Sequence, residues 1–144
     1  MRYLPALALV AAVVVASFAK AAPLPPFAPV DICGTIVERL WVPSEFRHGQ
    51  PGFSGSLGHD RVIPAHLRVV LADYAGVDAA VARRINTLLG YTPPPDEHQR
   101  VLLRLPTDDP NLLAGVRRVC VEGFAIRGDE GGTWTSYRRA VPGG

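Results

Sequence analysis

The sequence predicts a mainly β domain of five strands with one inserted amphipathic helix. Five segments are rich in β-branched and aromatic residues or alternate apolar with polar residues, as half-buried strands do. One segment instead carries apolar residues three and four positions apart, which is the spacing of an amphipathic helix. Clusters of glycine and proline separate these segments and indicate turns.

The first predicted strand covers residues 32–42, ICGTIVERLWV, and Pro43 ends it. Residues 44–63 hold four glycines and one proline without any periodicity, so we expect a long loop, of a kind that is usually functional or mobile. The second predicted strand covers residues 66–74, where apolar and polar positions alternate.

The predicted helix covers residues 77–89. Asp78 lies in or just before its first turn, where a carboxylate interacts favourably with the helix dipole. Gly90 is placed to end the helix, and the prolines at 93–95 prevent its continuation. The apolar stripe of this helix consists of Val77, Val81, Ile85 and Leu88.

Three further elements are predicted after this helix. The third strand covers residues 99–105, and a short helical turn follows at 110–114. The fourth strand covers residues 116–127, in which Gly123 indicates a bulge or a bend. A fifth strand at 133–141 completes the domain.

The first 21 residues have the features of a secretory signal peptide. Arg2 precedes an apolar run of about 15 residues, which is shorter than the roughly 20 that a membrane span needs. An Ala-x-Ala cut site follows at 19–21. We therefore expect cleavage, a proline-rich lead-in at 22–30 and a single domain at 31–141. The expected location is periplasmic or secreted, without a stable membrane anchor.

The charge balance depends on this leader. The whole chain has 15 basic and 13 acidic residues, and loss of Arg2 and Lys20 would leave equal numbers of each. A neutral chain argues against a nucleic-acid partner, because such binding needs a concentrated basic surface.

The two cysteines, Cys33 and Cys120, are expected to form a disulfide. In an oxidising compartment two lone cysteines most often pair, and the loop of almost ninety residues would stabilise the fold by roughly 4–5 kcal/mol. The alternative is a free nucleophilic thiol, but both cysteines lie in β-branched runs, where buried thiols are usually inert.

Three short motifs resemble the OB-fold superfamily. They are Leu-x-Gly-Val-x-x-Val-x-Val-x-Gly at 113–123, Ile-x-Gly-x-Ile at 32–36 and Gly-Gly-x-Trp at 131–134. The resemblance implies a five-stranded Greek-key barrel that binds oligonucleotides, oligosaccharides or protein partners. In such a barrel the first and fourth strands are neighbours, which agrees with a disulfide between their two cysteines. The helix at 77–89 departs from the usual pattern, because many OB domains have only a turn there.

The resemblance also implies a ligand surface on the second and third strands, flanked by the first and last long loops. The tryptophans in this region can stack on a sugar or a base, or pack in the core. The arginines can contact a ligand or simply be solvated. The candidate ligand-binding residues are Trp41, Arg47, His48, Phe53, His59, Arg61, Arg68, Arg104 and Trp134, with Phe46 and Arg100 beside them.

The segment GSLGHDRVIPAH, residues 55–66, allows a catalytic alternative. Ser54 or Ser56 with a histidine and an acid would supply the residue types of a triad, but the Gly-x-Ser-x-Gly elbow is incomplete. A metal site could use the histidines and the acid of this loop, although their spacing matches no compact motif. The residues concerned are His48, His59, Asp60 and His66.

The sequence therefore favours an exported, non-enzymatic binding module for a protein, peptide or saccharide ligand in the cell envelope, without a cofactor. The alternative is a small metal-dependent or hydrolytic enzyme that uses His59, Asp60 and His66.

Overall fold

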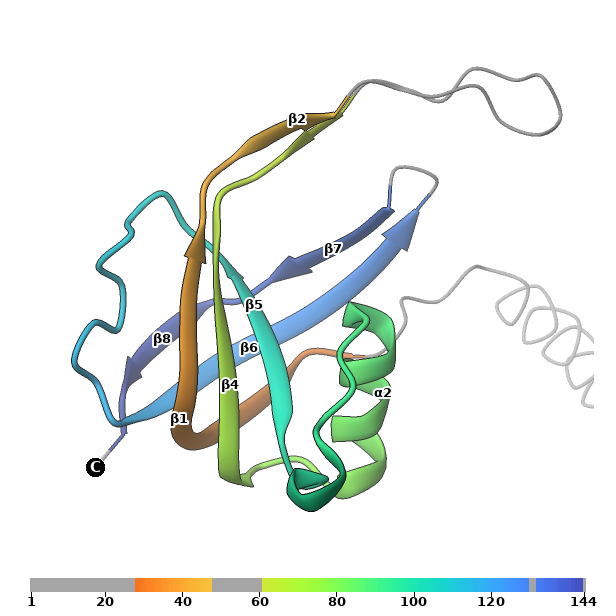
Figure 1. Ribbon diagram of the computed structural model, residues 1–144, viewed down its shortest axis with the longest axis vertical. Coiled ribbons are helices and arrows are strands. Elements are labelled where there is room, and N and C mark those ends of the chain that lie inside the picture. Colours follow the sequence, from red (N-terminus) through yellow and green to blue (C-terminus); the bar gives the residue numbers. More distant parts are fainter. Residues whose placement is uncertain (1–27, 48–60, 130–131, 144) are drawn as a thin grey trace, which may run out of the picture.

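The structure, a computed structural model, describes residues 28–47, 61–129 and 132–143. It is mainly β, as predicted, with one α-helix beside an antiparallel sheet (Figure 1). The signal peptide at 1–21 and most of the proline-rich lead-in lie outside the described residues. No helix in the described ranges is long and apolar enough to cross a membrane.

The elements follow the predicted order, with a few additions. The strands are β1 (Val30–Val42), β2 (Glu45–Arg47), β3 (Arg61–Ile63), β4 (His66–Ala75), β5 (Val101–Pro106), β6 (Arg118–Asp129), β7 (Gly132–Ser136) and β8 (Arg139–Pro142). The helices are α2 (Ala79–Leu89) and the 3-10 turn η1 (Pro95–Glu97).

The main sheet has six strands in the order β5-β4-β1-β6-β7, with β8 also paired to β6. Every pairing in it is antiparallel. The expected closed barrel is wrong, because β5 and β7 form the two edges of this sheet and no described backbone ladder joins them. The two edges do approach each other, and a guanidinium nitrogen of Arg104 on β5 lies 3.4 Å from the carbonyl oxygen of Thr133 on β7.

Helix α2 explains why the sheet stays open at β5. The side chain of Asn86 donates to the carbonyl of Arg100 and accepts from the amide of Leu102, both at 2.9 Å. At its start, the free edge of β5 is therefore bonded to helix α2, which lies beside it (Figure 1). The same helix contributes Ile85, which is fully buried, to the core.

The caps of α2 agree with those predicted from its sequence. Asp78 is the N-cap, and its carboxylate accepts a 2.8 Å hydrogen bond from the amide of Val81. Gly90 ends the helix in the left-handed conformation, with φ of 70°. The short helical turn expected at 110–114 is instead a run of turns in which no helix is assigned. Arg39 on β1 holds this run by donating to the carbonyls of Pro110 and Leu112.

The core lies on one face of the sheet and under the inner side of α2. The apolar residues predicted to face inward on β4 and β5 do lie in the core. On the opposite face Arg68 and Arg104 are accessible, whereas Val70 and Leu102 are buried. The fully buried core side chains include Ile32, Leu67, Val69, Leu71, Ile85, Val101, Leu103, Leu105, Val119, Val121, Phe124 and Ile126.

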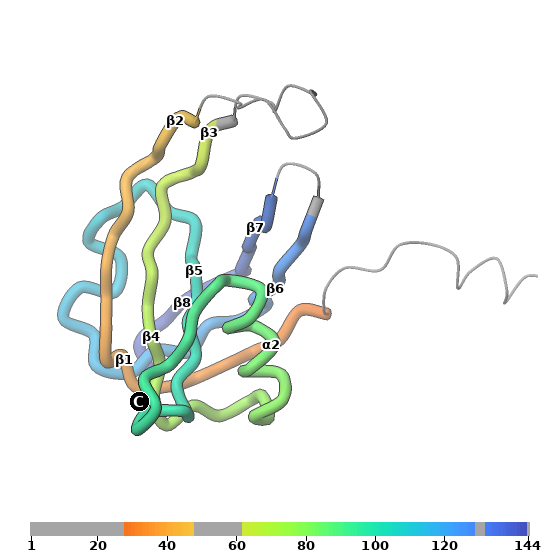
Figure 2. The backbone as a smooth tube through the Cα atoms, turned by 45° about the vertical axis from the view of Figure 1, so that its right-hand side comes forward, coloured from red at the N-terminus to blue at the C-terminus, as the bar shows by residue number. Residues whose placement is uncertain are grey.

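Strand β1 bends so that it can pair on both sides. Residues 30–35 pair with β6 and residues 33–42 pair with β4, and Figure 2 shows the strand curving along its length. Register shifts on either side of Thr35 accompany this bend. Gly34 lies there without a side chain because a Cβ would come within 2.9 Å of the Cβ of Leu71.

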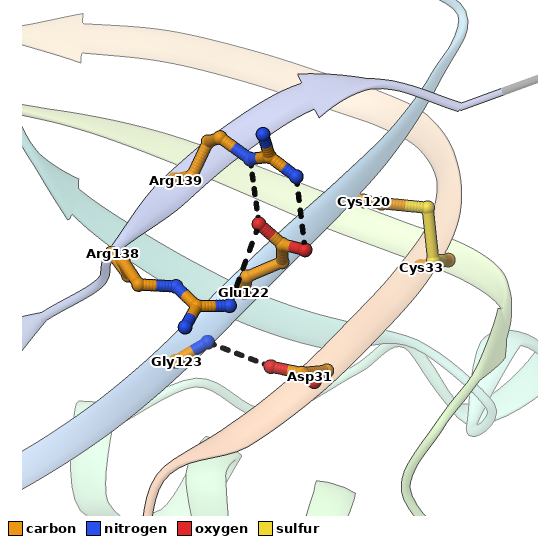
Figure 3. Close-up of polar contacts among 7 residues, drawn as sticks. All are labelled: Asp31, Cys33, Cys120, Glu122, Gly123, Arg138 and Arg139. Atoms are coloured by element: carbon orange, nitrogen blue, oxygen red, sulfur yellow. Dashed lines mark hydrogen bonds and ion pairs between the residues drawn. A yellow bond between two sulfur atoms is a disulfide. The ribbon is translucent and has the colours of Figure 1, made fainter.

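The disulfide predicted between Cys33 and Cys120 is present. The two residues are directly opposite in the β1–β6 ladder, with Cα atoms 4.0 Å apart (Figure 3). The covalent link therefore joins strands that backbone pairing already holds in register.

The predicted fifth strand is divided in two at Tyr137 and Arg138. Strand β8 pairs with β6 up to Glu122, and β7 pairs with β6 from Ala125 onward. Gly123 lies between the two ladders with φ of 68°, which fits the bend expected there. Asp31 on β1 accepts a 2.8 Å hydrogen bond from the amide of Gly123, as Figure 3 shows.

Candidate functional site

A cleft of about 570 Å³ lies where four separate segments meet. Its floor comes from the non-core face of β4 and β5, one side from the β2–β3 arm and the other side from β7. Figure 2 shows the β2–β3 arm and the β6–β7 hairpin rising at one end of the molecule. We call this the arginine cleft; it is lined by Val42, Pro43, Glu45, Arg47, Ile63, Pro64, His66, Arg68, Leu88, Arg104, Pro106, Gly132, Thr133, Trp134 and Thr135.

Four of the candidate ligand-binding residues lie around this cleft. Arg47 comes from β2, Arg68 from β4, Arg104 from β5 and Trp134 from β7. They are far apart in the sequence, and only the pairing of the strands brings them to one concave surface. His66, a residue of the catalytic alternative, also lines the cleft.

The other candidates lie elsewhere or outside the described residues. Trp41 pairs with Leu67 in the β1–β4 register and packs against the core, and its indole nitrogen donates to the carbonyl of Thr107 at 3.4 Å. Arg100 forms a 2.8 Å ion pair with Glu97 away from the cleft. Phe46 is exposed on β2. The remaining candidates lie outside the described residues: His48, Phe53, Ser54, Ser56, His59, Asp60 and the side chain of Arg61.

Arg68 and Arg104 form the floor of the cleft. They are direct partners in the β4–β5 register, so their side chains leave the same face of the sheet. Arg68 is exposed and Arg104 is partly buried. Burial lowers the pKa of the Arg104 guanidinium, and the positive charge of Arg68 lowers it further. Arg104 still remains positive at neutral pH, because a guanidinium is not deprotonated in proteins.

His66 is held at the edge of this floor by its own backbone neighbourhood. Its side chain is 8% exposed, and Nδ1 lies 3.0 Å from the carbonyl oxygen of Pro64. Burial lowers the pKa of this imidazole, and the charges of Arg104 and Arg68 act in the same direction. At neutral pH we therefore expect His66 to be uncharged and to donate from Nδ1 to Pro64.

Several residues of the cleft were not singled out from the sequence. A carboxylate oxygen of Glu45 lies 3.6 Å from a guanidinium nitrogen of Arg47. Glu45 is the acidic residue among those that line the cleft. Thr135 lines the cleft, and its buried hydroxyl has no hydrogen-bond partner in the structure. The signal for Glu45 was weak, because residues 44–63 have no periodicity and their β2–β3 pairing was not predicted.

A second hollow of about 300 Å³ lies next to the cleft on the same face of the sheet. The two share Arg68, and the second hollow is otherwise lined by the apolar side chains Leu40, Val70 and Leu102, the charged side chains Glu38 and Arg39, and Tyr91. Val70 and Leu102 in its wall are register partners, two positions along from the arginine pair on each strand. Burial, together with the negative charge of Glu38, raises the pKa of the Tyr91 phenol, so that this tyrosine stays neutral.

The part of the chain that the structure describes contains no cluster of side chains that could hold a metal ion. There, no three side chains among histidine, cysteine, aspartate and glutamate come close enough together to hold an ion. His66 is the described histidine of the loop segment, and its described contact is to a backbone carbonyl.

The arrangement can therefore bind a ligand through cations, an aromatic ring and backbone groups at the bottom of a concave surface. No family model, no curated protein and no solved structure matches the chain.

Proposed function

We propose that the chain is an exported, non-enzymatic binding module whose ligand site is the arginine cleft. One observation carries this proposal: Arg47, Arg68, Arg104 and Trp134, chosen from the sequence as ligand contacts, line a single cleft. A concavity of about 570 Å³ is within the range of small-molecule and oligosaccharide sites.

The strand order supports the OB-like topology behind this choice. The first predicted strand, β1, pairs with both the second, β4, and the fourth, β6, and the fifth pairs with the fourth. The cleft is bounded by the segment that joins the first two strands and by the hairpin that joins the last two, where OB domains usually bind ligands. Helix α2 contributes a single lining residue, Leu88, so the insertion borders the cleft without filling it.

The disulfide supports export. A link between Cys33 and Cys120 is compatible with an oxidising compartment such as the periplasm or the extracellular space. We accordingly expect the ligand in the cell envelope, as a protein, a peptide or a saccharide.

The proposal is tested by mapping where ligands bind. The ¹⁵N-labelled protein would be titrated with separate pools of peptides, neutral sugars, acidic sugars and nucleotides, and amide shifts recorded by NMR. We expect shifts to gather at residues 132–135, His66 and Arg104, and a Trp134→Ala variant to bind the same pool at least several-fold more weakly.

Two results would contradict it. Shifts that gather away from the cleft would show that the site is wrong. Signals of a new product during the titration would show turnover, and would favour the enzyme built on His59, Asp60 and His66 instead.

A further inference from the structure

The arginine pair on the floor of the cleft has an unusual charge arrangement. Arg68 and Arg104 stand directly opposite each other on neighbouring strands, where two like charges repel and destabilise the sheet. Within the described residues neither guanidinium has a carboxylate oxygen within 4.0 Å, although four other arginines do. The pair is thus two positive charges, one of them partly buried, without an ion pair to a described carboxylate; Glu38 lines the second hollow together with Arg68, but its carboxylate does not come within 4.0 Å of that guanidinium.

The surroundings of the pair favour an anion. Arg104 is oriented by the carbonyl of Thr133, which lies 3.4 Å from one of its terminal nitrogens and leaves its other donors available. Uncharged His66 and Thr135 line the same cleft and offer no competing negative charge. The one acidic lining residue, Glu45, is paired with Arg47 on the β2–β3 arm.

We infer that the cleft binds an acidic saccharide, whose carboxylate, sulfate or phosphate group lies between Arg68 and Arg104. This inference rests on the proposed function and names its ligand class. Arginine suits such groups because its planar fork forms two parallel charge-assisted hydrogen bonds to an oxyanion. An anion placed there converts the repulsion of the pair into two attractive contacts. Trp134 in the same lining adds an aromatic surface of the kind that contacts sugar rings.

The geometry favours a saccharide over an extended peptide. Asn86 already occupies the edge of β5 at Arg100 and Leu102, so an added peptide strand could pair only with β7 or with the rest of β5. The cleft floor is instead a sheet face made of side chains.

Isothermal titration calorimetry with a matched pair of probes tests the inference. The probes are a galacturonate tetrasaccharide and its methyl ester, which has the same rings without the charges. A sulfated disaccharide and a sugar phosphate provide the other two oxyanions and identify which group is preferred. We expect at least one acidic probe to bind, and removal of its charge to weaken binding at least tenfold.

Variants of the protein distinguish binding by the Arg68–Arg104 pair from attraction to positive charge elsewhere on the protein. Arg68→Gln and Arg104→Gln should each weaken the acidic probe at least tenfold, whereas Arg83→Gln on the exposed side of α2 should leave its affinity unchanged. Arg68→Lys keeps the charge but loses the fork, and should give an intermediate affinity. Removing one of two like charges should leave the unfolding temperature of the unliganded protein unchanged or raise it, so a loss of binding would not reflect misfolding.

The outcomes distinguish this inference from the function on which it rests. Neutral sugars that shift the cleft amides and bind the glutamine variants equally well would keep the binding module and overturn the acidic ligand. Tighter cleft binding by a Glu-rich peptide or by single-stranded DNA would overturn the saccharide class. Failure of all the acidic sugars to bind would overturn the inference as well.

Discussion

At the residue scale, the buried side chain of Asn86 forms hydrogen bonds to the backbone that a neighbouring strand would otherwise form. It is 4% exposed and satisfies two backbone groups of β5, the carbonyl of Arg100 and the amide of Leu102. An amide side chain is well suited to this position, because it offers a donor and an acceptor at the same time. A carboxylate would accept from Leu102 but could not donate to Arg100.

Replacing Asn86 should therefore destabilise the fold strongly. Asn86→Ala leaves one buried donor and one acceptor without partners, and we expect a loss of about 2–4 kcal/mol in the free energy of unfolding, measured by urea denaturation. The neighbouring Thr87→Ala is the control, because Thr87 is exposed and bonds only within its own helix. Equal stability of the Asn86 and Thr87 variants would contradict the role assigned to Asn86.

His66 makes stability depend on pH in a defined direction. Burial lowers the pKa of the folded imidazole below its ordinary value of 6.5, so the unfolded chain binds this proton more readily than the folded one. The stabilising contribution is present above pH 6.5 and is lost as the pH falls through that value towards the folded pKa. Urea midpoints measured between about pH 5 and pH 8 should fall towards acid, and less steeply in a His66→Gln variant. Identical slopes in the two proteins would contradict this assignment.

At the scale of single elements, β6 is divided by Gly123 into two ladders. The first half pairs with β8 and the second with β7, and the bend between them requires a left-handed residue. Just before the bend, the carboxylate of Glu122 accepts two hydrogen bonds from Arg139 (Figure 3). One of its oxygens also lies 3.8 Å from a guanidinium nitrogen of Arg138. The bend allows the β6–β7 hairpin to reach the cleft.

A substitution at this bend should be costly, whereas the same change further along the strand should not. In Gly123→Ala the new Cβ would lie 3.2 Å from the Cβ of Arg138, and the left-handed backbone adds about 1–2 kcal/mol. Gly128→Ala is the matched control, because no atom lies within 4 Å of its Cβ position and it stays within the same strand. We expect thermal unfolding to show a clear loss for the first variant and little change for the second. A similar loss in both would indicate that Gly123 has no special conformational role.

Elements governed by local pattern were predicted well. The stripe of α2 and its caps, Asp78 and Gly90, depend on neighbours within a few residues, and their outcome agrees with the sequence. The β2–β3 pairing and the division of the last strand depend on which distant segment lies alongside. Such choices leave no periodic signal in the residues themselves, so residues 45–47 and 61–63 were expected only as parts of a loop.

At the scale of the whole molecule, the same distinction applies to the site. Alternation along β4 and β5 placed Arg68 and Arg104 on the non-core face, as the structure has them. For Trp41 the sequence left ligand stacking and core packing open, and in the structure it pairs with Leu67 and packs against the core. The sequence could not predict that the open edge of β5 would be covered by α2 rather than by closure of the barrel.

The disulfide is the covalent constraint on the whole fold. Cys33 and Cys120 are 87 residues apart in the sequence and adjacent in the β1–β6 ladder, so the link restricts nearly the whole described chain in the unfolded state. In the chain-entropy model a loop of this length contributes about 4–5 kcal/mol. Because backbone pairing already holds the two strands in register, the reduced protein should keep the same fold.

We therefore expect the double variant Cys33→Ala/Cys120→Ala to fold with unchanged NMR shifts in the arginine cleft and a much lower urea midpoint. The slope of the transition should increase, because the unlinked chain exposes more surface when it unfolds. Native protein treated with a reductant is the control, since it loses the link without any change in side-chain volume. If the double variant had the same free energy of unfolding as the oxidised protein, this account would be contradicted, because the disulfide would then contribute nothing to stability.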